Sequence, residues 1–454
     1  MSTHPSLDRW SRVTTLLLFG VMALVSAGCT GPSDGDSGEA APPIVLIDLG
    51  TLRADHLGSY GYARQTSPEI DALAAESIRF EWAFSQAPTT APSLASMLTG
   101  LYPATHGMRS GENRLPGEAV TLAEALAERG YATAAFVDGG YLSAGFGFDQ
   151  GFAHYESSRG GGLEEIGPRA IEWLREHASE PFFLMVHSYD IHAPYDPPED
   201  LRDAFLGDLD SPVEGFEASA ERLDSAAVGE TPLTTSELEH AKALYDAGIL
   251  FVDRWVGQLM DELRDLGLDE RAIAVVVADH GEAFLEHGAL LHDTPYTPVT
   301  RVPLIVRLPG GELTGTVPQV VETLDVMPTL LDLAGAPLPP GIQGESLVPL
   351  MRGEGKPPYI AFGESTFDGG SKYVAMGGFH LIVHDESGRA ELFAFEVDPL
   401  EQDDRAAAEP QRVEALLQRL EEWEQRVAAA VLGQEEAPMD EETLEQLRSL
   451  GYVQ

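Results

Sequence analysis

Cysteine and lysine are nearly absent from this sequence. Cys29 is the only cysteine, so the chain can form no internal disulfide and no thiolate metal cluster. Lysine occurs only at Lys242, Lys356 and Lys372, and 28 basic residues face 74 acidic ones, which gives a net charge of -46. Such a surface repels nucleic acid, which we therefore exclude as a partner, and it is typical of a solvated, salt-tolerant protein.

The N-terminus carries the pattern of a bacterial lipoprotein signal peptide. Two arginines precede an apolar run over residues 16–25, and small residues lead to Cys29. We expect residues 1–29 to be the signal peptide, Cys29 to carry lipid, and residues 30–41 to be a flexible linker. The protein would then be extracytoplasmic and anchored to a bacterial membrane, in the periplasm or at the cell surface. Plain secretion and an uncleaved anchor are the alternatives, although the apolar run is short for a membrane span.

Short apolar runs alternate with amphipathic ones along residues 42–340. Short β-branched runs predict buried strands, and apolar residues that recur every three to four positions predict helices. The order is βαβα, so we expect an α/β fold in which helices cover both faces of a large, mostly parallel mixed sheet. The expected strands are at residues 43–49, 132–137, 181–187, 272–278 and 302–307, and the expected helices at 67–75, 92–98, 120–129, 167–177, 235–266 and 325–334.

The pattern changes after residue 341. Four short runs with glycine-containing turns, and then a charged amphipathic stretch, predict a smaller C-terminal subdomain, residues 341–454, of antiparallel sheet and helix. The expected strands are at 359–362, 373–376, 380–384 and 391–396, and the helix at 411–431. Residues 197–234 are acidic and carry few helix or strand signals. We expect an insertion or lid there, or else a loop or disordered segment.

The most informative motif is Asp279-His280-Gly281-Glu282, directly after the predicted strand at 272–278. Open α/β sheets place their chemistry at the carboxyl ends of strands. A carboxylate and an imidazole at that edge offer an oxygen and a nitrogen ligand to a divalent metal. An Asp that only caps the next helix is the alternative.

Four further segments accompany this motif in a fixed order. They read Thr-Leu-Arg-Ala-Asp-His-Leu-Gly from residue 51, Thr-Thr-Ala-Pro-Ser-Leu from residue 89, His-Ser-Tyr-Asp-Ile-His-Ala-Pro-Tyr from residue 187, and Leu-Arg-Ser-Leu-Gly-Tyr-Val at 447–453. Together they resemble the sulfatase family of the alkaline phosphatase superfamily, over residues 42–454. The resemblance implies a large mixed sheet between helices and a C-terminal four-stranded antiparallel sheet. It also implies a hydrolase whose nucleophile, at a helix N-terminus, attacks sulfur or phosphorus beside a divalent metal.

The resemblance implies that Thr90 is the nucleophile. The family has a cysteine or serine there that is modified to formylglycine, and because the chain has Thr90 instead, we expect no formylglycine. A threonine hydroxyl on a metal is a workable nucleophile, and it resembles that of the phosphodiesterase branch of the superfamily. Leu94 replaces an arginine of the family motif, which disfavours sulfate esters. A helix N-cap role for Thr90 is the alternative.

The first strand departs most from the family pattern. Related sequences have a metal-binding Asp where this chain has Gly50, and Asp48 lies two residues earlier on the same strand face. The displacement is about 6–7 Å along the strand, so we expect Asp48 to reach the site only through a bulge or a slipped register. Otherwise the site lacks one ligand and is impaired.

The remaining candidates follow from the same motifs. We assign a divalent metal (Ca, Mg, Mn or Zn) to Asp48, Thr90, Asp279 and His280, catalysis to Thr90, His187 and His192, and substrate binding to Asp190, His287 and His292. The alternative for His187 and His192 is a structural role, in which the imidazole only forms a hydrogen bond with the backbone. Arg53 with Asp55, and also His106, are expected to be structural, and we give His380 and His384 no role.

These assignments favour an extracytoplasmic hydrolase of phosphate or phosphonate esters, with sulfate esters second, whose substrate is a small molecule, glycan or lipid. Two alternatives stay open. A pseudoenzyme would keep the fold as a surface binding protein, which the residues at 50 and 94 motivate. A transferase would move a phospho-headgroup onto lipid or glycan through the same covalent intermediate.

Overall fold

Eight strands form the central sheet of the computed structural model, which describes residues 41–450 except 159, 210–211, 368 and 440. Their order across the sheet is β11-β2-β10-β7-β1-β6-β4-β5. Neighbouring strands run parallel except at β10, which is antiparallel to both β2 and β7. The predicted large, mostly parallel mixed sheet is therefore confirmed. The strands are β1 (Ile44–Leu49), β2 (Ile78–Phe84), β4 (Ala132–Val137), β5 (His154–Ser157), β6 (Phe182–Ser188), β7 (Ile273–Val277), β10 (Arg301–Arg307) and β11 (Gly315–Glu322).

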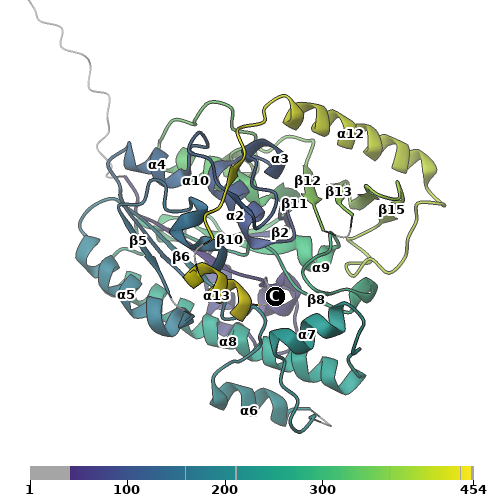
Figure 1. The fold of residues 1–454 in the computed structure, drawn as a ribbon. Helices are drawn as coiled ribbons and strands as arrows, with labels where there is room; N and C mark the ends of the chain where they lie inside the picture. Colours follow the sequence, from purple (N-terminus) through teal and green to yellow (C-terminus); the bar gives the residue numbers. More distant parts are fainter. Residues whose placement is uncertain (1–40, 159, 210–211, 368, 440, 451–454) are drawn as a thin grey trace, which may run out of the picture. The chain divides into compact units, whose positions relative to one another are not determined.

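Helices cover both faces of this sheet (Figure 1). α5 packs on β4, β6 and α8, while α2, α4 and α10 pack against one another. Because strands such as β1 are covered on both faces, all six of its residues are buried, which explains its nearly continuous apolar sequence. The helices of these layers are α1 (Pro68–Ala75), α2 (Thr90–Thr99), α4 (Leu122–Ala127), α5 (Gly162–His177), α8 (Thr235–Asp265) and α10 (Val326–Leu333).

The acidic segment at residues 197–234 contains two helices, α6 (Glu199–Gly207) and α7 (Ala220–Ala227), where the sequence carried few helix signals. α6 buries Leu201 and Phe205 against the long helix α8. α7 is capped by Ser219, whose side chain accepts a hydrogen bond from the backbone N–H of Arg222. Packing and capping thus stabilise helices whose own sequence is a weak helix former.

A second, smaller sheet follows, as predicted. Its antiparallel order is β12 (Ile360–Ser365), β13 (Ser371–Met376), β14 (Phe379–His384) and β15 (Ala390–Phe393). Helix α12 (Pro410–Ala428) covers one face, where the Trp423 indole stacks on the Phe362 ring with centroids 5.4 Å apart. Short elements complete the chain: α3 (Pro103–His106), α9 (Thr297–Thr300), α11 (Val348–Met351), β3 (Asn113–Arg114), β8 (Ala283–Phe284), β9 (Leu290–Leu291) and β16 (Glu435–Glu436).

The last helix, α13 (Glu441–Ser449), returns to the large sheet (Figure 1). Leu447 belongs to the main core, and the Gln446 side chain accepts a hydrogen bond from the backbone N–H of Gly140 at 3.1 Å. The final motif is described only as far as Leu450. The domain boundary that we placed at residue 340 stays a prediction.

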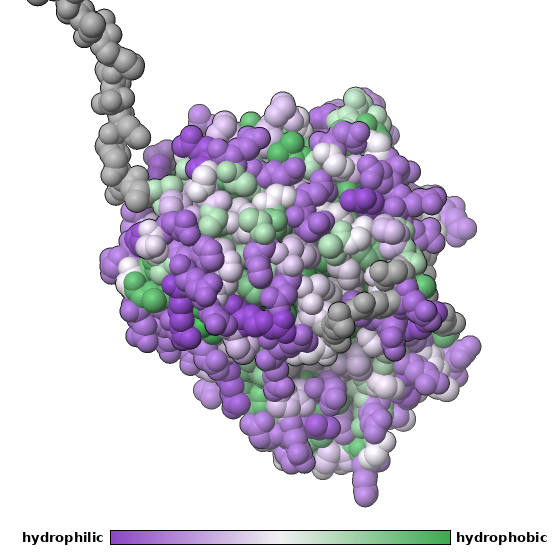
Figure 2. Space-filling view, turned by 60° about the vertical axis from the view of Figure 1, so that its left-hand side comes forward, coloured by the Kyte–Doolittle hydropathy of each residue, from purple (hydrophilic) through white to green (hydrophobic). Residues whose placement is uncertain are grey.

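The predicted signal peptide and linker, with Cys29, lie outside the described residues. Within the described part of the chain, no helix combines the length and the apolar content that crossing a bilayer requires. Figure 2 shows hydrophilic residues over most of the visible face, which agrees with the net charge of -46.

Candidate active site

Three neighbouring parallel strands bring two of the predicted metal ligands, Asp48 and Asp279, together with the predicted catalytic residue His187 at one edge of the sheet. β1 lies between β6 and β7, and Asp48 pairs in register with His187 of β6 and Val277 of β7. Asp279 follows β7 by two residues, and its Oδ1 atom accepts a hydrogen bond from the backbone N–H of Thr51, which follows β1 by two residues. The ligand atoms of Asp48, His187 and Asp279 all lie within 4.8 Å of one another, and all three residues are fully buried.

The electrostatics of this group suit a divalent cation. Among the described residues, no hydrogen bond of ordinary geometry reaches the carboxylate of Asp48, the ring nitrogens of His187 or the Oδ2 atom of Asp279. Burial, together with the nearby charge of Asp279, holds the pKa of Asp48 well above its usual range. Burial also lowers the pKa of His187 to about 4, so its imidazole is neutral and able to bind a metal. Two carboxylate oxygens and a nitrogen are a ligand set that fits a divalent metal.

The expectation that Asp48 needs a bulge was wrong. β1 pairs with both neighbours without irregularity, and Asp48 reaches the group from a regular strand. The reason is that His187 on β6 pairs with Asp48 on β1. The group of Asp48, His187 and Asp279 therefore forms at the position of Asp48, two residues before Gly50 along the strand. A Cβ atom on Gly50 would lie 3.4 Å from the Nε2 atom of His187 and 3.1 Å from the carbonyl oxygen of Ser188. Because Gly50 has no side chain, there is room for the His187 imidazole next to it.

Thr90 is the first residue of α2, and Thr89 is the N-cap, so the N-cap alternative for Thr90 is wrong. Thr90 Oγ1 lies 3.2 Å from His280 Nε2, and His280 Nδ1 lies 2.9 Å from the carbonyl oxygen of Gly281. Because a carbonyl only accepts, Nδ1 carries the ring proton, and Nε2 accepts the Thr90 hydroxyl. Burial lowers the pKa of His280 to about 3, which keeps it a neutral acceptor.

Three histidines in contact with one another, His280, His292 and His192, connect Thr90 to a cavity, and we call them the histidine line. The ring centroids of His280 and His292 are 4.5 Å apart, and the Nε2 atoms of His292 and His192 are 3.2 Å apart. Burial lowers the pKa of both outer imidazoles, that of His192 to about 3. His192 and His292 border a cavity of about 140 Å³ that also meets Thr89 and Ala91 at the start of α2. His292, which we predicted to bind substrate, therefore lines the same cavity as Thr89 and Ala91, the two chain neighbours of the predicted nucleophile Thr90.

Two predicted substrate-binding residues lie elsewhere. His287 is exposed, stacks on Tyr296 with ring centroids 3.5 Å apart, and contacts the carbonyl of Leu400 at 3.1 Å. The Asp190 carboxylate accepts hydrogen bonds from the Leu163 backbone N–H and the Ser188 hydroxyl. It therefore caps α5, which explains why this helix begins five residues before the predicted start. Asp190 does border a larger cavity of about 490 Å³, which touches the other side of His192.

Residues expected to be structural behave as such. Arg53 forms a two-pronged ion pair with Asp55, at 2.9 Å and 2.8 Å, and its other terminal nitrogen donates to the Glu282 carbonyl. His106 accepts a hydrogen bond from the Met108 backbone N–H and contacts the Ser96 hydroxyl. In the small sheet, His380 pairs with Glu401 at 2.7 Å and His384 with Glu391 at 2.6 Å. Leu94, at the family's arginine position, is fully buried in the core.

Sequence reasoning missed Thr51 and Tyr245. Thr51 has a positive φ of 61°, which is rare for a residue other than glycine, and its backbone N–H donates to Asp279 Oδ1 at 3.2 Å. The buried Tyr245 hydroxyl holds this turn by donating to the Thr51 carbonyl at 2.7 Å. Tyr245 positions Asp279 through this strained turn. Its only signal in the sequence was an aromatic residue on the apolar side of a long helix, which is also the signal of a core residue.

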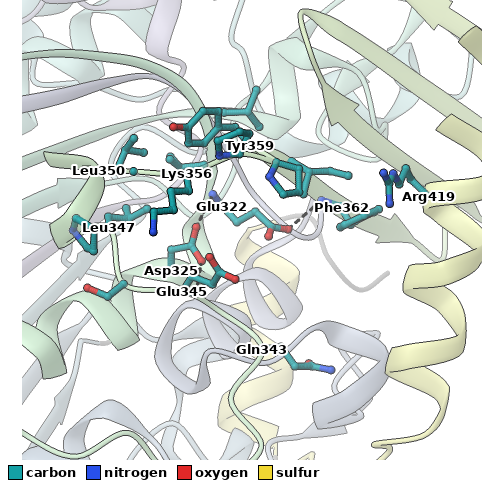
Figure 3. A pocket seen from close by; sticks show the side chains of 18 of the residues that line it. Glu322, Asp325, Gln343, Glu345, Leu347, Leu350, Lys356, Tyr359, Phe362 and Arg419 are labelled. Carbon is teal, nitrogen blue, oxygen red and sulfur yellow. Dashed lines mark hydrogen bonds between the residues drawn. The ribbon is translucent and has the colours of Figure 1, made fainter. Parts of the chain in front are cut away.

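A larger cavity, of about 1190 Å³, lies between α12, β11 and the start of the small sheet (Figure 3), and His192, His280 and His292 are not among its lining residues. Its buried carboxylates are engaged in structural hydrogen bonds. Glu322 accepts from the Phe362 backbone N–H at 2.9 Å, and Asp325 accepts from the Glu345 backbone N–H at 2.8 Å. The lining of this cavity therefore contains neither the Asp48, His187 and Asp279 group nor Thr90.

Comparison with known protein families gives a match over most of the chain. The family model described as "Sulfatase" matches residues 42–336. The chain belongs to the sulfatase family. A second model, the C-terminal domain of N-sulphoglucosamine sulphohydrolase, matches residues 286–425. The resemblance to this family within the alkaline phosphatase superfamily is thus confirmed, and the chain is a hydrolase of the sulfatase fold.

Individual relatives show how broad the family is. Human arylsulfatase A is 31% identical over 356 residues, which cover 70% of this chain and 69% of the relative. The solved phosphonate monoester hydrolase of Agrobacterium radiobacter has a TM-score of 0.69 at 21% identity, covering 86% of this chain and 96% of its own. A structure in complex with the substrate D-glucosamine-2-N,6-O-disulfate has a TM-score of 0.74 at 21% identity, covering 86% and 98%. These two structural likenesses establish the fold.

Proposed function

We propose that this sulfatase-family chain hydrolyses phosphate or phosphonate esters with Thr90 as its nucleophile. The contact of Thr90 Oγ1 with His280 Nε2, beside two buried carboxylates, supports this most directly. Thr90 Oγ1 attacks phosphorus, the bond from phosphorus to the alcohol oxygen breaks, and the Thr90 proton passes to His280. The proton held by His280 then passes to the alcohol oxygen, which leaves as the free alcohol. Water then attacks the phosphothreonine: the water oxygen bonds to phosphorus, the bond from phosphorus to Thr90 Oγ1 breaks, and the proton that the water loses passes through His280 to Thr90.

Asp48, His187 and Asp279 would hold the divalent metal that the family implies. Thr90 and His280, also predicted as ligands, lie next to this group but not within it. When bound, the metal neutralises the paired carboxylates and offsets the negative charge of the phosphoryl group. The N-terminal N–H groups of α2 add a favourable site for an anion at Thr90.

Phosphorus esters are favoured over sulfate esters for two reasons. The nucleophile position holds a threonine, which is not a formylglycine precursor. The position of the family's arginine holds Leu94, whose side chain is in the core and offers no cation to a sulfate group. The fold likeness to a phosphonate monoester hydrolase fits this choice.

The pseudoenzyme alternative rested largely on Gly50, and the position of Asp48 now weakens it. We retain in the proposal an extracytoplasmic, lipid-anchored location, since the N-terminal sequence supports it. A transferase would share the phosphothreonine and differ only in the final acceptor. It is therefore an outcome of the same experiment.

Hydrolysis by the purified protein tests the proposal. The substrates are 4-nitrophenyl esters of phosphate, phenylphosphonate and sulfate and a bis-aryl phosphodiester, each with Zn, Mn, Mg or Ca. We expect metal-dependent release of nitrophenol from at least one phosphorus ester. Thr90→Ala should lower kcat about a thousandfold or more. Thr90→Ser keeps a hydroxyl and should retain most of the activity.

Thr99→Ala is the matched control, because Thr99 ends the same helix and its hydroxyl bonds only within it, to the Ala95 carbonyl. It should leave turnover unchanged. Phosphate on Thr90, trapped by acid quench and located by mass spectrometry, would identify the nucleophile directly. Turnover that survives in Thr90→Ala would refute the assignment, and product bound to an added alcohol instead of water would indicate the transferase.

A further inference from the structure

The group of Asp48, His187 and Asp279 offers few oxygen atoms to a metal ion. Both carboxylate oxygens of Asp48 and the Oδ2 atom of Asp279 are buried and accept no hydrogen bond of ordinary geometry from the described residues. The Oδ1 atom of Asp279 is already engaged, because it accepts hydrogen bonds from the backbone N–H groups of Thr51 at 3.2 Å and His280 at 2.8 Å. The two carboxylates therefore offer three oxygens, two from Asp48 and one from Asp279.

The remaining donor atom of the group is a nitrogen. Neither ring nitrogen of His187 has a hydrogen bond of ordinary geometry within the described part of the chain, and its Nε2 atom lies 3.9 Å from Asp48 Oδ2. A second imidazole adjoins the group, since His280 Nε2 lies 3.4 Å from Asp279 Oδ2. The ligand set is therefore mixed, with imidazole nitrogen beside carboxylate oxygen.

The packing around the group leaves little room for bound water. Asp48, His187 and Asp279 are all fully buried, and none of them lines either of the two cavities that border His192. Even a Cβ atom on Gly50 would lie 3.4 Å from His187 Nε2 and 3.1 Å from a backbone carbonyl oxygen. An ion held here must take most of its ligands from the protein.

These donor atoms discriminate among divalent ions. Charge alone does not, because two carboxylates balance any divalent cation. Ca²⁺ takes about six to eight oxygen ligands, and Mg²⁺ demands a nearly ideal octahedron and usually keeps several waters. Zn²⁺ binds imidazole nitrogen and carboxylate oxygen together, and in catalytic sites it has three protein ligands and a fourth position for water or substrate. Two carboxylates and one imidazole therefore match zinc and leave calcium and magnesium short of ligands.

We propose that Asp48, His187 and Asp279 select Zn²⁺ over Ca²⁺ and Mg²⁺, and that His187 is the residue that sets this preference. The inference rests on the function proposed above, because the same three residues hold the metal there. It goes further by naming the ion and by assigning its selection to one side chain.

Binding of metal alone to the full chain tests this without turnover. Calorimetry on protein stripped with chelator should show a single Zn²⁺ per chain, bound about a hundredfold or more tightly than Ca²⁺ or Mg²⁺. X-ray absorption at the zinc edge should show about four ligands at about 2.0–2.2 Å, with imidazole among them. Ca²⁺ or Mg²⁺ binding as tight as that of Zn²⁺, a zinc spectrum without imidazole, or a failure of all three ions to bind would overturn the inference.

A variant at His187 locates the preference. His187→Asn replaces the nitrogen donor by an amide oxygen, so it should lower the affinity for Zn²⁺ about tenfold or more and leave those for Ca²⁺ and Mg²⁺ nearly unchanged. His106→Asn is the control, since it removes another fully buried imidazole, which bonds to the Met108 backbone N–H and contacts the Ser96 hydroxyl. It should leave the ratio of the affinities unchanged. Circular dichroism verifies folding, and His187→Gln replaces a variant that fails to fold. An unchanged ratio in the folded variant would refute the role of His187.

The same preparation, loaded with each ion in turn, is assayed for hydrolysis of 4-nitrophenyl phenylphosphonate. Selection of Zn²⁺ without any turnover would refute the proposed reaction and leave the metal assignment standing. Turnover by a chain that prefers Ca²⁺ or Mg²⁺ would refute only the metal assignment.

Discussion

Replacing Asp48 with Asn should affect stability in opposite directions with and without metal. In the metal-free protein, the Asp48 carboxylate is fully buried beside that of Asp279, and burial raises its pKa well above the usual range. Asp48→Asn removes this charge, so it should raise the free energy of unfolding by about 1–3 kcal/mol. In the metal-bound protein the same change removes a ligand, and the stabilisation by metal is lost.

The shift in melting temperature follows from the size of the folded unit, residues 41–454. An unfolding entropy of about 2.1 cal/mol/K per residue gives about 0.9 kcal/mol/K, so 1–3 kcal/mol corresponds to about 1–3 °C. Metal at about 1,000 times its dissociation constant adds about 4.1 kcal/mol, or about 5 °C, to the wild type. Calorimetric scans in chelator and in excess metal should therefore show the variant melting higher in the first and lower in the second.

Asp253→Asn provides the control. Asp253 is also a fully buried carboxylate, but it accepts hydrogen bonds from the backbone N–H groups of Glu69 and Ile70, and it belongs to no metal-binding group found among the described residues. Its replacement should lower the melting temperature by the same amount in chelator and in metal. If Asp48→Asn also melts lower than the wild type in chelator, the uncompensated carboxylate is not a source of instability, and the reasoning fails.

Further predictions concern the rest of the fold. Burial lowers the pKa of His106 to about 3, so its contribution to stability is complete above pH 6.5, the unfolded value, and falls as the pH drops, by about 2 kcal/mol at pH 5. His106→Gln should therefore reduce the fall in melting temperature between pH 6.5 and pH 5. His154→Gln, at an exposed position, should leave that fall unchanged. Trp423→Ala should cost about 3–5 kcal/mol in chemical unfolding, because it empties the contact between α12 and the small sheet. Leu94→Arg should destabilise the protein and add no sulfatase activity, since the side chain would be buried in the core.

Local patterns in the sequence were enough to predict most of the framework. The β-branched run at 272–278 and the apolar run at 43–49 became β7 and β1, because strands buried on both faces need continuous apolar sequence. The rule that chemistry lies at the carboxyl ends of strands placed Asp279 and His280 correctly at the sheet edge. Pro92 and the small residues around it predicted the helix that carries Thr90, although its start was placed two residues late.

The rest depended on contacts between distant segments. That Asp48 lies level with His187 follows from the register between β1 and β6, which no pattern within either segment determines. Helix α7 depends on its Ser219 cap and on packing, in a stretch whose composition indicates a loop. Asp190 was placed correctly at the end of β6, but its partner, the N-terminus of α5, lies 27 residues earlier. Position along a strand could be predicted, whereas the partners of each side chain could not.

The central position of β1 has a consequence for synthesis of the chain. Both neighbours of this strand are translated long after it, and the bond between Thr51 and Asp279 spans 228 residues. At about 5–20 residues per second, a ribosome needs about 10–45 s to make that stretch. Until β6 emerges, a strand that is apolar except for Asp48 has two open edges, and until β7 emerges it has one; open edges are templates for aggregation. Binding of a chaperone to the nascent chain until β7 emerges would prevent such pairing.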